Sequence, residues 1–368
     1  MRPSPRAVVA APRPLLLVLA LLALLALFAP LRLRAQATTV PRAERVFYYV
    51  DRESSWDSFR AHVDQIGIVA PQSYSVDSLG VVFGDVDPSV IAMAKAHGVR
   101  VMPLVVDEGF NQAELHKLLT DSTAQQRAID ALVELCRRNG YWGMQFDVED
   151  LSIVDRDRFT AFYTNAARAL HAAGFAVSIA IVPRASDLAG ATAYDRWMFD
   201  SWRGSYDLAP LGRVSDFVSW MTYDQHTRRT PPGAVAGVPW MRASVEFALR
   251  YIPANKLSLG IPLYSGYWYV EAQPGTALRA AVSGTSVSYA WGAHLLERAG
   301  ATVQWDDANK TSYGIAPTGP INAWVFLSDA RSFAAQAALI SEFHLRGLSA
   351  WVLGMEDARI WDALPPTR

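Results

Sequence analysis

Short apolar runs alternate with longer amphipathic segments along most of the chain. The apolar runs are typical of buried strands, and the longer segments repeat their apolar residues at helical spacing. We expect strands at 46–50, 66–70, 99–106, 143–149, 176–182, 217–223, 257–262 and 348–353. We expect helices at 56–65, 88–97, 112–119, 123–138, 155–173, 194–202, 241–251 and 328–346. The chain therefore repeats a strand-helix unit along its length.

This repetition predicts an α/β protein of the (β/α)₈ TIM-barrel class. A doubly wound sheet fits less well, because no glycine-rich phosphate-binding pattern follows the first strand. The segment from about 265 to 324 departs from the repeat, with short polar stretches and aromatic clusters such as Tyr267-Trp268-Tyr269. We interpret it as a small α+β lobe inserted between the seventh and eighth strands of a barrel that occupies residues 45–368.

The expected strand at 143–149 carries carboxylates on one of its faces. At period two, the apolar face comprises Trp142, Met144, Phe146 and Val148, and the opposite face comprises Gly143, Gln145, Asp147 and Glu149. Both faces of a parallel sheet are covered, and burying unpaired charge is costly. Asp147 and Glu149 therefore indicate a functional site. The alternative is an ordinary strand end followed by a helix-capping Asp150.

Other chemically active side chains fall at the same end of the expected barrel. Reactive residues of such barrels lie at the carboxyl ends of the strands. This rule collects Asp147, Glu149, Met221, Tyr223, Asp224, Tyr264 and Trp351. We find no cysteine nucleophile, no Gly-x-Ser-x-Gly turn and no histidine-carboxylate cluster at metal-ligand spacing, so we expect no metal and no cofactor. Carboxylates beside aromatic rings are what a sugar-cleaving site requires.

Four motifs, in order, resemble glycoside hydrolase family 18, the chitinase-like barrels. They are Gly143-Met-Gln-Phe-Asp147-Val-Glu149, Met221-Thr-Tyr223-Asp224, Lys256-Leu-Ser-Leu-Gly260-Ile-Pro262-Leu-Tyr264 and Gly347-Leu-Ser-Ala-Trp351-Val-Leu-Gly354-Met-Glu356-Asp357. The resemblance covers nearly all of residues 45–365. It points to the branch that includes spore-cortex and peptidoglycan N-acetylglucosaminidases.

The resemblance implies a role for each matching residue. Glu149 would be the general acid and later the base, with a pKa raised so that its carboxyl group holds a proton. The substrate's own acetamido oxygen would attack the anomeric carbon, with net retention. Asp147 would orient the acetamido N–H, Tyr223 would hydrogen-bond its carbonyl group, and Trp351 would lie beneath the sugar. The remaining substrate-binding residues would be Gln145, Met221, Asp224 and Tyr264.

Two positions depart from the family motif. Trp142 stands where its first Asp would fall, and Gln145 stands where its middle Asp would fall. An amide at 145 can hydrogen-bond Asp147 but cannot share a proton with it, so Asp147 would titrate differently. We interpret Gln145 as a mark of the peptidoglycan-type branch, and we expect Trp142 on the helix-facing side of its strand.

Several of these residues have a second interpretation. Asp224 is equally well a helix cap, and Trp351 taken alone is equally well a core residue. Tyr264, Trp268 and Glu356 are weaker candidates. Trp268 would either stack on a sugar or pack the inserted lobe.

The N-terminus has the features of a secretory signal peptide. Basic residues precede an apolar run at 15–29, and Ala35-Gln36-Ala37 fits the small-x-small cleavage pattern. We predict a signal peptide at 1–37 and a linker at 38–44, and hence a secreted or periplasmic location; an uncleaved membrane anchor is the alternative. Removal of five arginines with this segment changes the formal net charge from −1 to −6. An acidic chain argues against nucleic-acid and anionic-membrane partners.

The sequence therefore predicts an exported, monomeric glycosidase acting on β-linked N-acetylglucosamine glycans of the peptidoglycan or chitin-like kind. The first alternative is a non-catalytic carbohydrate-binding barrel of the same family, against which the presence of Glu149 argues. The second is a barrel hydrolase of amide or ester bonds, which lacks an identifiable nucleophile or metal set. Cys136 is the single cysteine, so no internal disulfide can form, and we interpret it as a packing residue.

Overall fold

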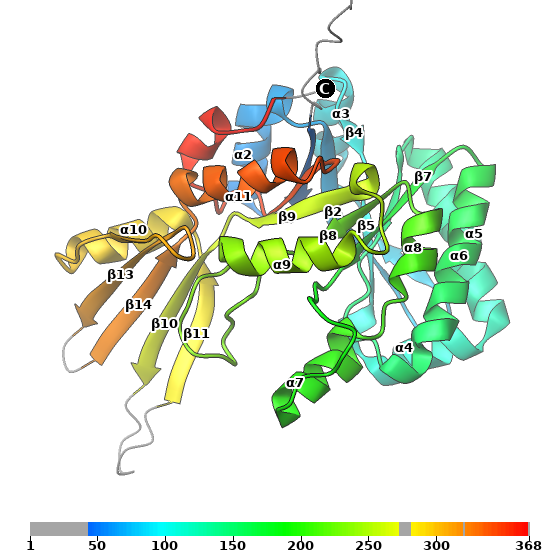
Figure 1. Ribbon diagram of the computed structural model, residues 1–368. Coiled ribbons are helices and arrows are strands. Elements are labelled where there is room, and N and C mark those ends of the chain that lie inside the picture. Colours follow the sequence, from blue (N-terminus) through cyan, green and yellow to red (C-terminus); the bar gives the residue numbers. More distant parts are fainter. Residues whose placement is uncertain (1–42, 272–280, 319–320, 367–368) are drawn as a thin grey trace, which may run out of the picture. The chain divides into compact units, whose positions relative to one another are not determined.

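Figure 1 shows the computed structural model, which describes residues 43–271, 281–318 and 321–366. The predicted signal peptide lies outside these ranges, as does the predicted linker up to residue 42. All described residues belong to one structural unit, Pro41–Arg368. None of the helices in these ranges has the length and apolar character needed to cross a membrane.

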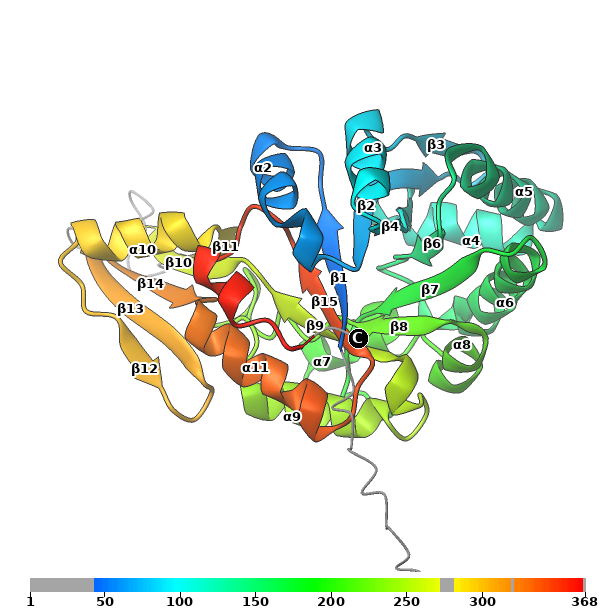
Figure 2. The same ribbon diagram turned by 90° about the horizontal axis from the view of Figure 1, so that it is seen from above.

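A closed barrel of parallel strands lies at the centre of this unit (Figure 2). Within the described ranges, eight strands pair in order around it: β1 (Glu44–Tyr49), β2 (Ile68–Val76), β5 (Leu104–Asp107), β6 (Gly143–Phe146), β7 (Ala176–Ile181), β8 (Phe217–Trp220), β9 (Leu257–Pro262) and β15 (Gly347–Trp351). β1 pairs in parallel with both β2 and β15, which closes the sheet. The short strands β3 (Val82–Gly84) and β4 (Arg100–Val101) also pair with β2. The predicted barrel is confirmed.

Helices follow the strands around the barrel (Figure 1). They are α2 (Glu53–His62), α3 (Pro88–Ala96), α4 (Gln112–Thr120), α5 (Ser122–Asn139), α6 (Arg156–Ala172), α7 (Ala193–Met198), α8 (Leu208–Val214), α9 (Val238–Ala248) and α11 (Ala330–Glu342). α5 illustrates how the sequence sets their ends. The Asp121 side chain accepts hydrogen bonds from the backbone N–H groups of Thr123 and Ala124 at 2.8 and 3.1 Å. Gly140 ends the helix in the left-handed conformation, at φ 67°.

The period-two pattern of the strands divides the core into two layers. Phe47, Val69 and Val105 face outward and pack with the surrounding helices. Tyr48 and Leu104 face the barrel interior and belong to a second cluster of buried side chains. The alternation in the sequence therefore decides which side chains point toward the barrel axis.

Trp142 does not follow the predicted alternation. It packs against the interior cluster, and its indole stacks on Phe217 with 6.4 Å between ring centroids. The guanidinium carbon of Arg100 lies 4.2 Å from its ring centroid. The prediction of a helix-facing Trp142 was wrong because β6 begins only at Gly143. The period of the strand does not extend to the bend before it.

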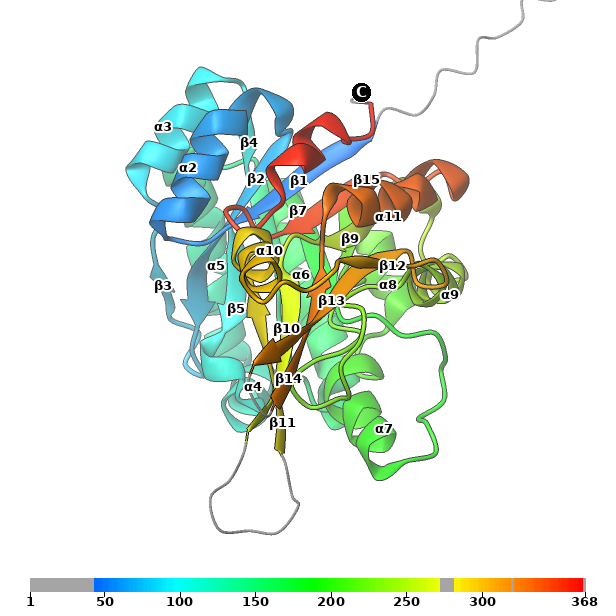
Figure 3. The same cartoon turned by 90° about the vertical axis from the view of Figure 1, so that its left-hand side faces the viewer.

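The interval between β9 and α11 forms a separate antiparallel sheet (Figure 3). Its strands are β10 (Ser265–Glu271), β11 (Ala281–Val287), β12 (Gln304–Asp306), β13 (Thr311–Thr318) and β14 (Ile321–Leu327), in the order β11-β10-β14-β13-β12. α10 (Tyr289–Arg298) packs on this sheet through Leu296. The predicted lobe between the seventh and eighth barrel strands is confirmed.

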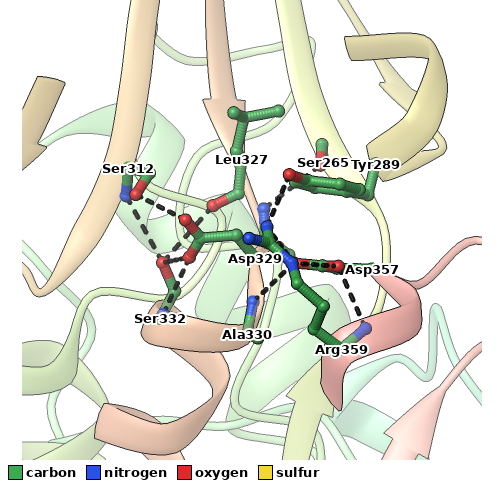
Figure 4. Close-up of polar contacts among 10 residues, drawn as sticks. Ser265, Tyr289, Ser312, Leu327, Asp329, Ala330, Ser332, Asp357 and Arg359 are labelled. Atoms are coloured by element: carbon green, nitrogen blue, oxygen red, sulfur yellow. Dashed lines mark hydrogen bonds and ion pairs between the residues drawn. The ribbon is translucent and has the colours of Figure 1, made fainter. Parts of the chain in front are cut away.

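Polar contacts tie this lobe to α11 and to the segment after β15 (Figure 4). The buried carboxylate of Asp357 accepts hydrogen bonds from the backbone N–H of Ala330 at 2.9 Å and from the Arg359 guanidinium at 2.7 Å. The same guanidinium donates to the Tyr289 hydroxyl of α10 at 2.7 Å. The lobe is therefore fixed to the barrel by directional contacts as well as by chain connectivity.

Candidate active site

A cavity of about 730 Å³ opens at the carboxyl ends of the barrel strands. Its wall includes strand-end residues (Glu149, Tyr223, Asp224 and Tyr264), residues after β7 (Tyr194, Trp197, Trp202 and Arg203), residues after β8 (Arg228 and Arg229) and residues of the lobe (Trp268 and Thr285). Sequence reasoning selected the strand-end residues, because it relied on the barrel rule. It did not select those from the longer loops.

The two predicted carboxylates follow β6 directly. β6 ends at Phe146, earlier than the sequence predicted, so Asp147 and Glu149 project beyond the sheet. The Asp147 N–H still donates to the Val105 carbonyl at 2.9 Å. The Tyr206 hydroxyl donates to the carbonyl of residue 148 at 2.7 Å. These contacts hold the segment in place at the mouth of the barrel.

Neither Asp150 nor Asp224 caps a helix. Asp150 accepts a hydrogen bond from the Gln112 side chain at 2.8 Å, and the next helical turn is preceded by Ser152. Asp224 accepts a hydrogen bond from the Tyr264 hydroxyl, and the next helix is α9, much further along the chain. The helix-cap interpretations of both residues were therefore wrong, and Asp224 belongs to the cavity wall.

The environment raises the pKa of both predicted carboxyl groups. Desolvation raises the pKa of Glu149 well above its usual value, and the charges on Asp147 and Asp224 add to this effect. Desolvation also raises the pKa of Asp147, which is 4% exposed, with a further contribution from Asp107. A carboxyl group that holds its proton beside a cavity can donate it to a leaving oxygen.

Asp107 is a third carboxylate that sequence reasoning missed. It ends β5 and is 3% exposed, and its Oδ2 accepts a hydrogen bond from the Asn111 N–H at 3.1 Å. Its Oδ1 has no hydrogen-bond partner among the described residues. Desolvation raises the pKa of Asp107 to about 6. The barrel rule would have found it, but the expected strand stopped one residue short, at 106.

Two tyrosines stand beside Glu149 in the cavity wall. The rings of Tyr223 and Tyr264 meet edge to face, with centroids 6.3 Å apart. Burial raises the pKa of both hydroxyl groups well above the usual value, so both remain hydrogen-bond donors at neutral pH. Met221 and Trp351 pack with the same cluster, but neither is among the described lining residues. The structure thus gathers these four predicted residues, with only the tyrosines at the cavity surface.

Gln145 lies deeper in the barrel and is fully buried. Its Nε2 donates to Ser178 Oγ at 2.8 Å and to Ser219 Oγ at 3.1 Å. Among the described residues, neither Gln145 Oε1 nor Asp147 Oδ1 has a hydrogen-bond partner. The hydrogen bond that the sequence allowed between Gln145 and Asp147 is therefore not formed. Gln145 belongs to a polar layer of serines beneath the carboxylates.

The weaker candidates Trp268 and Glu356 have structural contacts. Trp268 is 2% exposed, and its indole N–H donates to the Thr227 carbonyl at 3.3 Å. These contacts agree with packing of the lobe, and the ring also forms part of the cavity wall. Glu356 accepts hydrogen bonds from the Ser58 hydroxyl and from the Gly354 N–H, the latter at 2.6 Å. These hydrogen bonds stabilise the turn after β15.

An aromatic arm, residues 192–203, was expected only as a helix near 194–202. α7 is followed directly by a π-helical turn, Phe199–Arg203. Thr192 and Asp195 form a capping box at its start. Tyr194, Trp197 and Trp202 bring aromatic rings to the cavity. The density of aromatic residues was the available signal, but their orientation depends on how the arm folds back.

The described residues contain neither a metal-ligating cluster nor an exposed thiol. Within residues 43–271, 281–318 and 321–366, no group of three or more His, Cys, Asp or Glu side chains is arranged to hold a metal ion. Cys136 is buried in α5, and desolvation raises the pKa of its thiol to about 12. Such a thiol acts as a packing group.

Comparison with known proteins identifies the family. The model for glycosyl hydrolases family 18 matches residues 45–356. The chain belongs to this family. Its barrel is a glycoside hydrolase domain of the chitinase and cortex-lytic type.

Individual relatives agree with this assignment. The cortical fragment-lytic enzyme of Bacillus subtilis is 32% identical over 66% of this chain, which spans 54% of the enzyme's length. YdhD of the same organism, named as a sporulation-specific glycosylase, is 27% identical over 69% of this chain, which spans 58% of it. The chain therefore spans little more than half the length of these two relatives. The chitinase structure from Chromobacterium violaceum superposes with a TM-score of 0.77 and 26% identity, covering 87% of this chain and 97% of that one.

Proposed function

We propose that this protein hydrolyses β-linked N-acetylglucosamine glycans, in peptidoglycan or a chitin-like polymer, with retention by substrate-assisted catalysis. One observation carries the proposal. Glu149 lies on the wall of the cavity, and burial together with neighbouring carboxylates raises its pKa well above the usual value. The similarity to a cortical fragment-lytic enzyme and to a chitinase supports this class of substrate.

In the proposed reaction, Glu149 acts first as an acid and then as a base. It gives its proton to the glycosidic oxygen as the bond to the anomeric carbon breaks, and the substrate's acetamido oxygen attacks that carbon. The deprotonated Glu149 then takes a proton from the water molecule that opens the oxazolinium intermediate. Two inversions at one carbon give net retention.

Other residues would position the acetamido group and the sugar ring. Asp147 would orient the acetamido N–H and stabilise the positive charge that develops beside it. Tyr223 would donate a hydrogen bond to the acetamido carbonyl, a role that its raised pKa supports. Trp351 would lie beneath the sugar ring. Gln145, fully buried, would act through the polar layer beneath Asp147.

A Glu149→Gln variant tests the proposal. The purified parent should release reducing ends from N-acetylglucosamine oligomers and peptidoglycan fragments. Loss of a general acid should lower kcat by about 10²- to 10⁴-fold. Glu246→Gln, which makes the same change at an exposed position of α9, is the matched control and should keep parental activity.

The mechanism and the non-catalytic alternative have separate tests. A thiazoline mimic of the oxazolinium intermediate should inhibit competitively, and lack of inhibition would argue against participation of the acetamido group. If parent and Glu149→Gln both bind the glycans without turnover, the protein is a carbohydrate-binding barrel instead.

We further propose that the chain is exported as a monomer, with cleavage after Ala37. The support is the charge and hydropathy pattern of residues 1–37. N-terminal sequencing of the protein from the producing cells should begin at residue 38, and light scattering should give the mass of one chain. A protein that keeps residue 1 and sediments with membranes would contradict this proposal.

A further inference from the structure

Three arginine side chains line the same cavity as Glu149. Arg203 ends the aromatic arm, and Arg228 and Arg229 lie in the loop between β8 and α9. Arg203 is half-buried, and the other two are exposed. The proposed mechanism uses none of these guanidinium groups. We call this part of the cavity, the three arginines together with the aromatic arm, the arginine end.

No described carboxylate pairs directly with these arginines. In the part of the chain that the structure describes, none of the three forms an ion pair, and the buried Nε of Arg203 has no hydrogen-bond partner. Burial lowers the pKa of Arg203, yet a guanidinium group stays charged at any working pH. A charged donor that has lost water without gaining a partner favours an anionic ligand.

The acidic residues of the cavity wall, Glu149, Asp195 and Asp224, compensate this charge only in part. Burial raises the pKa of Glu149, which favours its neutral form. Asp224 accepts a hydrogen bond from Tyr264, and its charge acts on Glu149. Asp195 accepts hydrogen bonds from the N–H and the hydroxyl group of Thr192, at 3.2 and 2.7 Å. It is the carboxylate of a helix cap at the start of the aromatic arm, and it interacts with Arg203 through its charge without forming an ion pair.

Exposed aromatic rings accompany the arginines. Trp197 is 38% exposed, and the guanidinium carbon of Arg229 lies 4.9 Å from its ring centroid. Tyr194 lies 5.7 Å from Trp197, and Trp202 lies 6.4 Å from it, between ring centroids. The buried indole N–H of Trp202 has no partner among the described residues. The arginine end thus offers flat apolar faces together with unpaired donors, as a charged sugar requires.

We propose that the arginine end binds a sugar residue that carries a carboxylate, such as the 3-O-lactyl group of N-acetylmuramic acid. The inference rests on the proposed function and narrows it. The protein would then act on a glycan in which N-acetylglucosamine alternates with a carboxylate-bearing sugar, in preference to a neutral chitin-like chain. A lactyl carboxylate and the carboxylates of an attached peptide stem share this chemistry.

The first measurement compares substrates that differ only in charge. The probes are a β-linked tetrasaccharide of alternating N-acetylglucosamine and N-acetylmuramic acid, and its dimethyl ester, in which both lactyl carboxylates are esterified. Loss of charged hydrogen bonds should lower kcat/KM for the ester by about 10- to 100-fold. Added salt should reduce this preference, because the arginines 228 and 229 are exposed. A peptide-bearing fragment and its esterified form test the second source of the carboxylate.

The second measurement repeats the comparison with variants. Arg203→Gln, Arg228→Gln and Arg229→Gln should each reduce the ratio of acid to ester kcat/KM. If Arg203→Gln impairs folding, the variants at the exposed positions 228 and 229 still test the proposal. Arg213→Gln, at an exposed position of α8, is the matched control and should keep the parental ratio.

Binding of the acid and ester forms of the tetrasaccharide to the full-length Glu149→Gln protein, measured by calorimetry, separates this inference from the proposed function. Tighter binding of the acid by about 10-fold or more supports the arginine end even if the parent hydrolyses nothing. Equal binding and equal turnover of acid and ester overturn it, while hydrolysis of both leaves the proposed function intact. A preference for the acid that survives in all three arginine variants also overturns it.

Discussion

Replacing Asp107 with Asn tests whether the buried carboxyl group at the end of β5 acts on stability and on the active-site carboxyls. Asn has the size of Asp and keeps an oxygen that can accept a hydrogen bond from the Asn111 N–H. In the parent, this nitrogen lies 3.1 Å from Asp107 Oδ2. The change removes a group whose pKa burial raises to about 6 from an ordinary 3.8. It therefore deletes an ionisation and preserves the shape.

The raised pKa of Asp107 sets the sign and size of the effect. A carboxyl whose pKa is higher in the folded protein stabilises the fold fully below its unfolded pKa of 3.8, and that stabilisation is lost as the pH rises through about 6. A difference of about two pKa units corresponds to about 3 kcal/mol. The free energy of unfolding of Asp107→Asn should therefore rise by about 3 kcal/mol relative to the parent between about pH 3.5 and pH 7.

Urea unfolding at intervals across this pH range measures the difference. Asp85→Asn, at an exposed position, is the control and should stay within about 0.5 kcal/mol of the parent at every pH. The charge on Asp107 also contributes to the raised pKa of Glu149 and of Asp147. Its removal should move the alkaline limb of the pH–rate profile to lower pH. A difference in stability that stays constant with pH would refute the reasoning.

Two further substitutions test the attachment of the lobe. Trp268→Ala removes a buried indole between the lobe and the loop after β8 and should lower the free energy of unfolding by about 3–5 kcal/mol, with Trp268→Phe losing less. A loss below about 1 kcal/mol in chemical denaturation contradicts this packing role. Arg359→Gln should lower that free energy by about 1–2 kcal/mol at neutral pH. Burial alone would raise the pKa of Asp357, but the Arg359 guanidinium holds it below its usual value, so this stabilisation is present above the ordinary pKa and is lost as the pH falls. An Arg359→Gln effect that persists unchanged in acid contradicts the assignment.

The barrel was predictable because its strands and helices carry local patterns. The alternation in β1 and β5 decided the inward and outward residues, and the lobe was visible as a break in the repeat. Strand ends were less predictable. β6 ends at Phe146 and β8 ends at Trp220, although the alternating pattern of the sequence continues beyond both residues. A hydrogen-bonded ladder stops where its neighbour turns away, which the sequence of one strand does not record.

The candidate site was predictable only where it lies on strands. Glu149 and Tyr223 follow strand ends, so the barrel rule selected them. Trp202 and Arg203 reach the cavity through the fold of the aromatic arm, and Arg229 reaches it through a long loop. Their placement depends on contacts between segments far apart in sequence, for which periodicity carries no signal.

The pairing of β1 with β15 has a consequence for the order of folding. Glu44 pairs with Gly347, so the barrel cannot close until nearly the whole chain has been synthesised. The lobe is different, because β13 and β14 follow one another and can pair as a hairpin. A ribosome-bound chain that lacks β15 would therefore carry an open row of barrel strands. For the exported protein proposed above, late closure of the barrel keeps the polypeptide able to pass through a secretion channel until the final strand is made.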